Sequence, residues 1–299
     1  MHYLPFTLAA YFLNGVSVLV DKFLLSHKIT HPLVYIFYIS LISLVILIFI
    51  PFVHRPTLTV FLLASGSTIL WTVGLYMLYK ALCVGLVTRV VPVIGALIPI
   101  LLLIYAASTG AISSREMIAV SVLIFGILFL TLFEIRGKMH PKEFQYELLS
   151  AVLFAMSYTL LRSAYLQEQF FTVFVWSRVV LVPLGFLIIL LPKSRRIVFG
   201  SKDKPSFSLF SKTGLLFFVG QTTGGISELL LTFSVSLANP ALVNSLQGSQ
   251  YIFLFIASFF LAQKFPYVFA EQHARGALIS KLFGIVLVAF GLYIMATAG

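Results

Sequence analysis

The sequence predicts an all-α integral membrane protein in which ten transmembrane helices form two inverted five-helix repeats. Three observations lead to this prediction. Hydrophobic residues make up 60% of the 299 residues and charged residues only 10%, a composition that excludes a water-soluble globular chain. Ten apolar stretches reach the roughly 20 residues that a helix needs to cross the hydrocarbon core of a bilayer. A pattern of residues in the middle of the chain also recurs near its end.

The recurring pattern is an apolar run followed by a polar break that contains a glutamate. Residues 81–103, ALCVGLVTRVVPVIGALIPILLL, precede a break with Glu116. Residues 236–258, SLANPALVNSLQGSQYIFLFIAS, precede a break with Glu271. Both the runs and the glutamates are offset by 155 residues. A chain that repeats a hydrophobic helix and its polar break in each half is typical of a duplicated membrane protein.

Short breaks that contain helix-terminating residues separate the predicted helices from one another. Pro32, Pro56, Gly85 and Pro240 each mark one of these breaks. Two longer connections are predicted, at 192–212 and 263–278. The ten predicted helices lie at 4–26, 32–53, 57–82, 87–108, 116–133, 146–166, 170–191, 213–237, 240–262 and 279–297.

The polar segment 134–145 is the predicted boundary between the two halves. It divides the chain into a first repeat, 1–136, and a second repeat, 137–299. The first helices of the halves also match, because Ser17–Lys22 lies opposite Ser157–Arg162 at an offset of 140 residues. Since each half has an odd number of helices, the second half must be inserted in the opposite orientation, as in many secondary transporters.

The remaining composition excludes several classes of protein. The single cysteine, Cys83, rules out an intramolecular disulfide. The net charge of +11 is expected to face anionic lipid in loops rather than nucleic acid. The sequence contains neither a GxxxxGK[ST] phosphate-binding motif nor a Cys/His cluster at zinc spacing, so no cofactor or metal is expected. The apolar N-terminal run is predicted to be a first spanning helix rather than a cleaved signal.

These features resemble the drug/metabolite transporter superfamily, and within it the proteins with two EamA-like repeats. The resemblance covers nearly the whole chain and implies a ten-helix carrier. The chain departs from the family pattern at 263–277, where a longer segment replaces a short turn, and this leaves open a shared role for the second glutamate. The residues that carry the resemblance are Pro92 and Gln247 at kinks of the fourth and ninth helices, Glu116 and Glu271 beyond them, Gly126 and Gly284 in the last helix of each repeat, and Arg178 in the seventh helix.

Two arguments about the orientation in the membrane disagree. Side A is defined as the side of the loops that follow helices 1, 3, 5, 7 and 9. The positive-inside rule places side A in the cytoplasm and both termini outside, because fourteen basic residues lie at side A and only Arg55 and Arg115 at side B. The family resemblance implies termini inside, and we prefer the charge count. The side A residues are Lys22, Lys28, Arg136, Lys138, Lys142, Lys193, Arg195, Arg196, Lys202, Lys204, Lys212, Lys264, Arg275 and Lys281.

Cations near the side A ends of four predicted helices have two interpretations. Lys80 and Arg89 lie near that end of helices 3 and 4, and Lys22 and Lys281 near that end of helices 1 and 10. Each one taken singly is explained by a long side chain that reaches a lipid phosphate at the interface. If the helix faces converge, the four together form a basic mouth to a central site.

Arg178 and Glu228 are predicted to lie much deeper. Each is eight or nine residues from the side B end of its helix, or about 12–14 Å at a rise of about 1.5 Å per residue. An ionisable residue at this depth needs a partner or a function. The matched depth predicts an ion pair between helices 7 and 8. Such a pair is either a structural lock or part of a site for a substrate or a proton.

The ninth predicted helix adds a stripe of amides at similar depth. Asn244, Gln247 and Gln250 are spaced by three residues and therefore share one helical face. They either form interhelical hydrogen bonds or line a site. The segment 221–225 in helix 8 is interpreted as close helix packing, a hinge or part of the lining. The equivalents of the three amides in helix 4, at the offset of 155, are Arg89, Pro92 and Gly95.

These residues predict a secondary active transporter that moves a small organic metabolite by alternating access. The cations favour an organic anion or a phosphate-bearing solute. Two alternatives stay open. One is a proton-coupled exporter of amino acids or amphiphilic metabolites, with Glu228 as the proton carrier, and the other is a flippase or scramblase for a phosphorylated lipid. The predicted substrate-binding residues are Lys80, Arg89, Arg178, Glu228, Asn244, Gln247 and Gln250.

The expected partners follow from the same interpretation. They are a small-molecule substrate and the lipid bilayer, with a proton as an open choice of coupling ion and no nucleic acid. The chain is expected to act as a monomer or homodimer that crosses the cell (inner) membrane several times. No enzymatic activity is expected, because no nucleophile–base pair or metal-ligand set occurs at membrane depth in the sequence.

Overall fold

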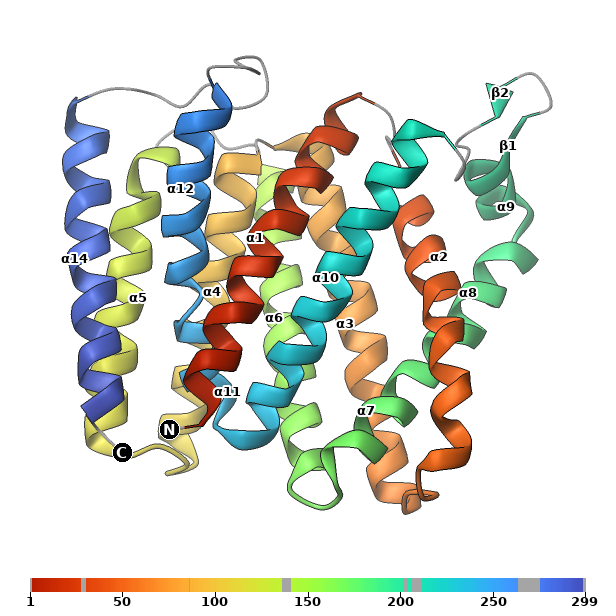
Figure 1. Ribbon diagram of the computed structural model, residues 1–299, viewed down its shortest axis with the longest axis horizontal. Helices are drawn as coiled ribbons and strands as arrows, with labels where there is room; N and C mark the ends of the chain where they lie inside the picture. The colour runs from red at the N-terminus through yellow and green to blue at the C-terminus, as the bar shows by residue number, and fades with distance from the viewer. Residues whose placement is uncertain are drawn as a thin grey trace.

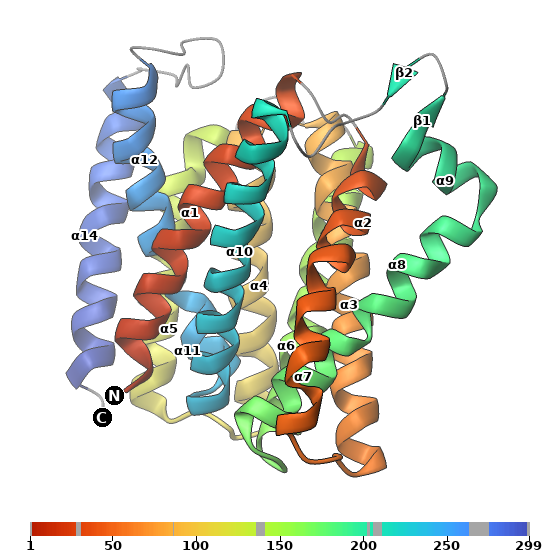
Figure 2. The same cartoon turned by 45° about the vertical axis from the view of Figure 1, so that its right-hand side comes forward.

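The computed structural model describes residues 2–27, 31–85, 87–135, 141–201, 204–205, 211–262 and 275–297. Most of these residues are helical, and the helices stand side by side in one bundle (Figure 1). Both ends of the described chain lie at the same end of the bundle, as Figures 1 and 2 show. In chain order the elements are α1 (Tyr3–His27), α2 (Pro32–Ile42), the 3-10 helix η1 (Ser43–Phe52), α3 (Leu58–Val84), α4 (Val87–Ser108), α5 (Ser114–Ile135), α6 (Pro141–Tyr165), α7 (Phe170–Val179), α8 (Leu181–Leu190), α9 (Pro192–Phe199), β1 (Gly200–Ser201), β2 (Lys204–Pro205), α10 (Lys212–Leu237), α11 (Pro240–Ser245), α12 (Gly248–Ala262) and α14 (Arg275–Thr297).

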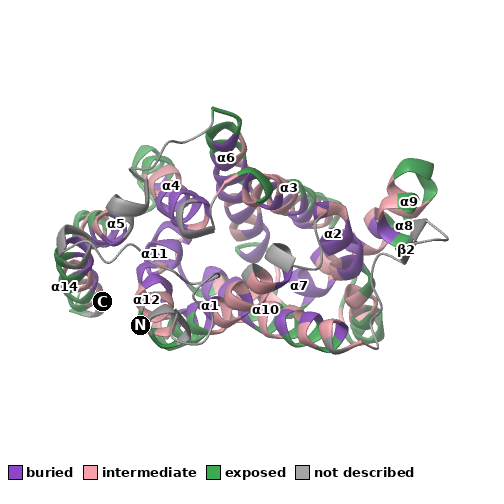
Figure 3. Ribbon diagram, turned by 90° about the horizontal axis from the view of Figure 1, so that it is seen from above, coloured by how far each residue is buried: buried purple, intermediate pink, exposed green. Residues whose placement is uncertain are grey.

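Seven helical stretches of the described chain are long and apolar enough to cross a membrane. Large hydrophobic side chains such as Phe52, Leu62 and Leu190 are exposed on the bundle. Seen along the bundle, the exposed residues mostly face outward and the buried residues face the neighbouring helices (Figure 3). An apolar exterior of this kind is solvated by lipid, so the chain has the architecture of an all-helical membrane protein. The seven stretches are Tyr3–Asp21, Pro32–Phe52, Leu58–Val84, Val90–Ser108, Pro141–Tyr165, Phe170–Leu190 and Thr213–Leu237.

The predicted breaks work as helix starts because their side chains satisfy backbone amides that have no partner within the helix. His31 accepts a hydrogen bond from the Leu33 amide through Nδ1 (3.2 Å), and Pro32 is the first residue of α2. At the start of α11, Asn239 Oδ1 accepts from the Ala241 amide (2.9 Å), again with proline in the first helical position. Proline is favoured there because its fixed φ suits the first turn and it has no N–H to leave unpaired.

Two of the predicted helices contain a change of geometry. The predicted helix 32–53 consists of α2 followed by the 3-10 helix η1, which includes Pro51. The predicted helix 170–191 consists of α7 and α8, which meet at Val180. Pro183 lies in the first turn of α8 and removes one amide donor from the helical hydrogen-bond pattern. Continuous α-helices were therefore the wrong prediction for these two ranges.

The predicted helix 240–262 is also divided, into α11 and α12. The break falls at the predicted kink, Leu246 to Gly248, and this part of the prediction is confirmed. Several amides there bond to the carbonyl three residues earlier, including Leu246 N to Val243 O (3.3 Å) and Gln250 N to Gln247 O (3.0 Å). This tighter pattern separates the two helices without a proline. In the fourth predicted helix, by contrast, α4 stays continuous through its two prolines.

Two predicted connections contain more regular structure than expected. The polar break 134–145 is shorter, because α6 begins at Pro141 with Glu143 in its first turn. The connection 192–212 contains the short basic helix α9 and a two-residue antiparallel pairing of β1 with β2. Most of the third predicted connection, 263–278, including Glu271, lies outside the described residues, and α14 already begins at Arg275.

Three helix pairs form the most extensive contacts of the bundle, namely α1 with α10, α3 with α6, and α5 with α14. Each pair joins a helix before the predicted boundary at residue 136 to a helix after it. Hydrogen bonds from small side chains hold the first two pairs closely together. Ser17 Oγ donates to Gly220 O (3.0 Å) between α1 and α10, and Ser157 Oγ donates to Ser67 O (2.9 Å) between α6 and α3.

Candidate functional site

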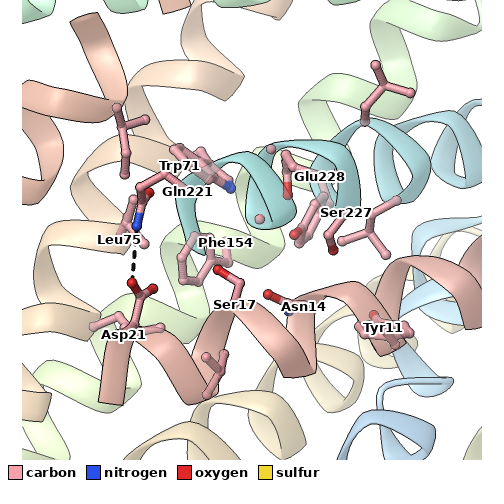
Figure 4. A pocket seen from close by; sticks show the side chains of 18 of the residues that line it. Tyr11, Asn14, Ser17, Asp21, Trp71, Leu75, Phe154, Gln221, Ser227 and Glu228 are labelled. Atoms are coloured by element: carbon pink, nitrogen blue, oxygen red, sulfur yellow. Dashed lines mark hydrogen bonds between the residues drawn. The ribbon is translucent and has the colours of Figure 1, made fainter. Parts of the chain in front are cut away.

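A cavity of about 430 Å³ lies within the bundle and is lined by residues from both predicted halves. Its walls are mainly apolar and aromatic, with polar side chains on α1, α7, α10, α11 and α12. Figure 4 shows the polar faces of α1 and α10 turned toward each other across this space. A largely apolar cavity with a few converging polar groups is the usual form of a site for a small organic molecule.

The three helix breaks described above all reach this cavity. Ile42 and Ser43 line it where α2 changes into η1. Arg178 and Leu181 line it where α7 meets α8, and Gln247 lines it between α11 and α12. In membrane proteins irregular backbone is tolerated where it is buried in protein or faces a cavity, and such breaks commonly form binding sites.

The predicted ion pair between Arg178 and Glu228 is confirmed. Arg178 Nη2 lies 3.1 Å from Glu228 Oε1, and the two side chains are only 14% and 18% exposed. The guanidinium also lies 5.5 Å from the centre of the Trp71 ring and 5.3 Å from that of Phe174. Aromatic faces attract cations, so the rings hold Arg178 beside its partner at the cavity wall.

Sequence reasoning missed a second carboxylate, Asp21 of α1. Asp21 lines the cavity, and its Oδ1 accepts a hydrogen bond from Gln221 Nε2 of α10 (3.1 Å; Figure 4). Tyr11, Asn14 and Ser17 precede it on the same face of α1 and also line the cavity. Their spacing of three or four residues was a visible signal, since polar residues that recur at this period share one face of a helix.

The amide stripe lines the cavity, which is one of its two interpretations, although the helix break divides it. Asn244 of α11, Gln247 of the break and Gln250 of α12 all line the space. Gln250 is 1% exposed; its Oε1 accepts from Asn14 Nδ2 (3.3 Å), while its own Nε2 has no hydrogen-bond partner among the described residues. A buried donor without an acceptor costs about 1–3 kcal/mol, so its presence calls for a reason.

The segment 221–225 also faces this space. Gln221, Gly224 and Gly225 line the cavity, and a Cβ at position 224 would meet the Ser17 side chain at 2.8 Å. The segment therefore combines lining with close packing of α10 on α1. Its glycines keep this part of α10 free of side chains beside the polar face of α1.

Two of the predicted cations are not placed in the site. Lys80 does not line the cavity; its Nζ lies 5.0 Å from the centre of the Tyr76 ring and 5.5 Å from that of Tyr146. The helix faces at this end therefore do not bring Lys80 to the cavity, and aromatic contacts account for its position. The side chain of Arg89 lies outside the described residues, so its predicted role stays a prediction.

Glu116, the glutamate of the first repeat, has a local structural role. Its Oε2 accepts hydrogen bonds from the amide (2.9 Å) and the hydroxyl (2.7 Å) of Ser113, and Ser113 Oγ accepts from the Glu116 amide (3.3 Å). This reciprocal arrangement is a capping box at the start of α5. The glutamate that marks the repeat thus explains where a helix begins, and it lies away from the cavity lining.

The aromatic residues divide between the site and the rest of the bundle. Trp71, Tyr79 and Tyr158 line the cavity together with Phe154 and Phe174. Elsewhere Trp176 donates its Nε1 hydrogen to His54 O (2.9 Å) near one end of the bundle. The cavity therefore offers large flat apolar surfaces between its polar groups, which suits an organic body with an apolar part.

Comparison with known proteins supports the fold alone. No protein-family model and no curated protein sequence matches the chain. A solved structure titled "Crystal structure of protein" is similar over 97% of this chain and 99% of that chain, with a TM-score of 0.64 and 12% sequence identity. At this identity the similarity shows a shared helical arrangement and carries no information on the substrate or the activity.

Proposed function

We propose that the protein is a secondary transporter that binds a small organic solute in the central cavity and releases it to either side of the membrane. The observation that carries this proposal is the meeting, at one cavity, of helix breaks, a paired arginine and a buried donor, Gln250 Nε2, that has no acceptor among the described residues. A solute acceptor would satisfy that donor. Broken helices at mid-bundle are the parts that transporters use to hold a substrate.

We further propose that ten helices cross the membrane as two inverted repeats. Equivalent helices of the two halves make equivalent contacts. The first helix of each half packs on the third helix of the other half, since α1 packs on α10 and α6 packs on α3. Likewise α5 contacts α14 and α4 contacts α11, which pairs the fifth and fourth helices of the halves. These reciprocal contacts support two repeats related by a pseudo-two-fold axis. The cavity between the repeats would open alternately to the two sides of the membrane.

The proposed location is the cell (inner) membrane, with the basic end of the bundle in the cytoplasm. The basic helix α9 and the first turns of α6 and α14 lie at one end of the bundle, and the two termini lie at the opposite end (Figure 1). The positive-inside rule then places both termini outside. This assignment follows the charge count rather than the family resemblance.

The charge of the substrate is a separate question. The anion prediction relies on Lys80, Arg89 and Arg178, and of these only Arg178 lines the described cavity. Glu228 balances its charge. Transport of four labelled solutes with a similar aromatic body would decide between cation, zwitterion, anion and phosphate-bearing anion: 2-phenylethylamine, phenylalanine, 3-phenylpropanoate and phenyl phosphate. Dependence of uptake on a pH gradient would identify a coupled proton.

The proposal is tested by replacing Arg178 in protein reconstituted into lipid vesicles. We expect Arg178→Ala to lower uptake of the transported solute by about tenfold or more, because a charged hydrogen-bonding group at the site is lost. Arg55→Ala is the matched control, since Arg55 is exposed and does not line the cavity. Unchanged uptake by well-folded Arg178→Ala protein, or the absence of uptake for any organic solute, would contradict the proposal.

A further inference from the structure

A second polar point lies in the same cavity, where Asp21 of α1 meets Gln221 of α10. In Figure 4 the two side chains face each other on one side of the view, and Glu228 lies farther along α10. Gln221 and Glu228 are seven residues apart, or about 10 Å along the helix. The cavity therefore has two separate charged positions, the Arg178–Glu228 pair and Asp21.

Asp21 differs from Glu228 in the partner that the structure gives it. Its hydrogen-bond donor is a neutral amide. Among the described lining residues Arg178 is the one basic side chain, and it is bonded to Glu228. A carboxylate inside an apolar wall is costly unless a positive charge or several donors accompany it. Among the described residues the hydrogen-bond donor to Asp21 is this amide, which occupies one of the roughly four acceptor positions of the carboxylate.

We propose that Asp21, positioned by Gln221, binds the protonated amine of the transported solute. This inference rests on the proposed transport function and names the substrate class of the same site. An ammonium group carries a full positive charge and three donors, which matches an acceptor-only carboxylate. A metal ion would require several oxygen ligands, whereas the hydrogen-bond partner of Asp21 is the N–H donor of Gln221 and the cavity lining is mainly apolar and aromatic.

The opposite part of α1 defines the other end of the solute. Asn14 lies seven residues before Asp21, about 10 Å along the helix, and donates to Gln250 Oε1. The Nε2 group of Gln250 then provides a donor without a described acceptor. The preferred solute is thus an amine with an apolar or aromatic body and a hydrogen-bond acceptor at its far end.

The experiment measures binding by isothermal titration calorimetry to the full chain in detergent or nanodiscs, with probes that share one body and differ in the head group. These probes are 2-phenylethylamine, 2-phenylethanol and 3-phenylpropanoate. We expect the amine to bind about 10- to 100-fold more tightly than the alcohol, the range for one charge-assisted hydrogen bond, and the carboxylate to bind most weakly. Asp21→Asn should remove the preference for the amine and leave binding of the alcohol unchanged.

Asp21→Asn is isosteric and keeps an oxygen that accepts from Gln221, so we expect it to fold. Glu168→Gln makes the same carboxylate-to-amide change at a bend that does not line the cavity and is the control. If Asp21→Asn does not fold, binding of the three probes to the unmodified protein still tests whether the site prefers an amine. Equal binding of amine and alcohol, tighter binding of 3-phenylpropanoate, or an unchanged amine preference in Asp21→Asn would overturn the inference. Amine binding without vesicle uptake would instead contradict the transport function and leave the amine site standing.

Discussion

Gly126 of α5 and Gly284 of α14 lie directly against each other's backbone. A Cβ on Gly126 would stand 3.2 Å from the Gly284 carbonyl oxygen, and one on Gly284 would stand 2.9 Å from the Gly126 carbonyl oxygen. One glycine lies in the last helix of each predicted repeat. Small residues at a helix crossing allow backbones to approach closely, which is the main means by which helices associate in lipid.

Alanine at either of these glycines should separate the two helices and destabilise the protein. A methyl group at 126 would lie 2.7 Å from Val288 Cγ2, and one at 284 would lie 2.7 Å from the Leu130 amide. We expect each substitution to lower the free energy of unfolding by about 1–3 kcal/mol, as overpacking does. Gly225→Ala is the matched control, because a Cβ at that position would have no neighbouring side chain or backbone within 4 Å. Denaturant unfolding in one detergent measures the stability of the three variants. Equal stability of the two test variants and the control would contradict the close crossing of α5 and α14.

The Arg178–Glu228 pair should behave as one unit in a double-mutant cycle. Arg178→Met or Glu228→Leu alone leaves a charge at an apolar cavity wall and should destabilise the protein more than the double substitution does. We expect a coupling energy of about 1–3 kcal/mol between the two positions. Thermal unfolding of the four proteins measures it. Strictly additive effects would show that the 3.1 Å contact does not contribute to stability.

Gln250 should matter more for solute binding than for folding. Gln250→Met removes the buried Nε2 group that has no described acceptor, together with the bond from Asn14. We expect little change in the melting temperature, because loss of the Asn14 hydrogen bond is nearly offset by removal of a buried donor that has no described acceptor. We also expect the KM of transport to rise about tenfold. Ser249→Ala is a neighbouring control, since that hydroxyl bonds to Leu246 O within its own turn. An unchanged KM would remove Gln250 from the site.

The capping box of α5 predicts a local effect. Ser113→Ala or Glu116→Ala should each cost about 1 kcal/mol of stability, because amides in the first turn lose their acceptors. Ser114→Ala, one position into the helix and exposed, should have no comparable effect. Transport should be unaffected in all three variants, since none of these residues lines the cavity. Loss of uptake in Glu116→Ala with normal folding would instead support a functional role for the repeated glutamate.

His31 at the start of α2 should make stability depend on pH. Burial, and then the positive charge of Lys80, lower the pKa of His31 below its ordinary value of 6.5. The unfolded chain therefore binds this proton more readily than the folded chain does. The contribution of neutral His31 to the stability of the fold is complete above pH 6.5, and it is lost as the pH falls through the lower pKa of the folded state. A protonated imidazole also cannot accept the bond from the Leu33 amide.

The pH effect is measured by thermal unfolding between neutral and mildly acidic pH. Asparagine caps a helix without titrating, so His31→Asn should remain capped and lose this part of the pH dependence. Lys80→Met removes the second cause of the shift and should reduce it without abolishing it. Identical pH profiles for the unmodified protein and His31→Asn would show that another group dominates acid sensitivity.

The positions of the helices, and the residues at which most of them begin, could be predicted from the sequence. Lipid requires each crossing to be an apolar helix of a certain length, and breakers such as Pro32 and Pro240 then mark the starts. The depth of Arg178 and Glu228 could be predicted for the same reason, because the rise per residue along a helix is constant.

Which helix faces meet could be read only from the packing of the whole bundle. In a membrane bundle the outer faces are as apolar as the core, so the pattern of hydrophobic residues says little about how each helix is rotated. Packing of α1 on α10 turned Asp21 toward the cavity, while Lys80 turned to its aromatic neighbours.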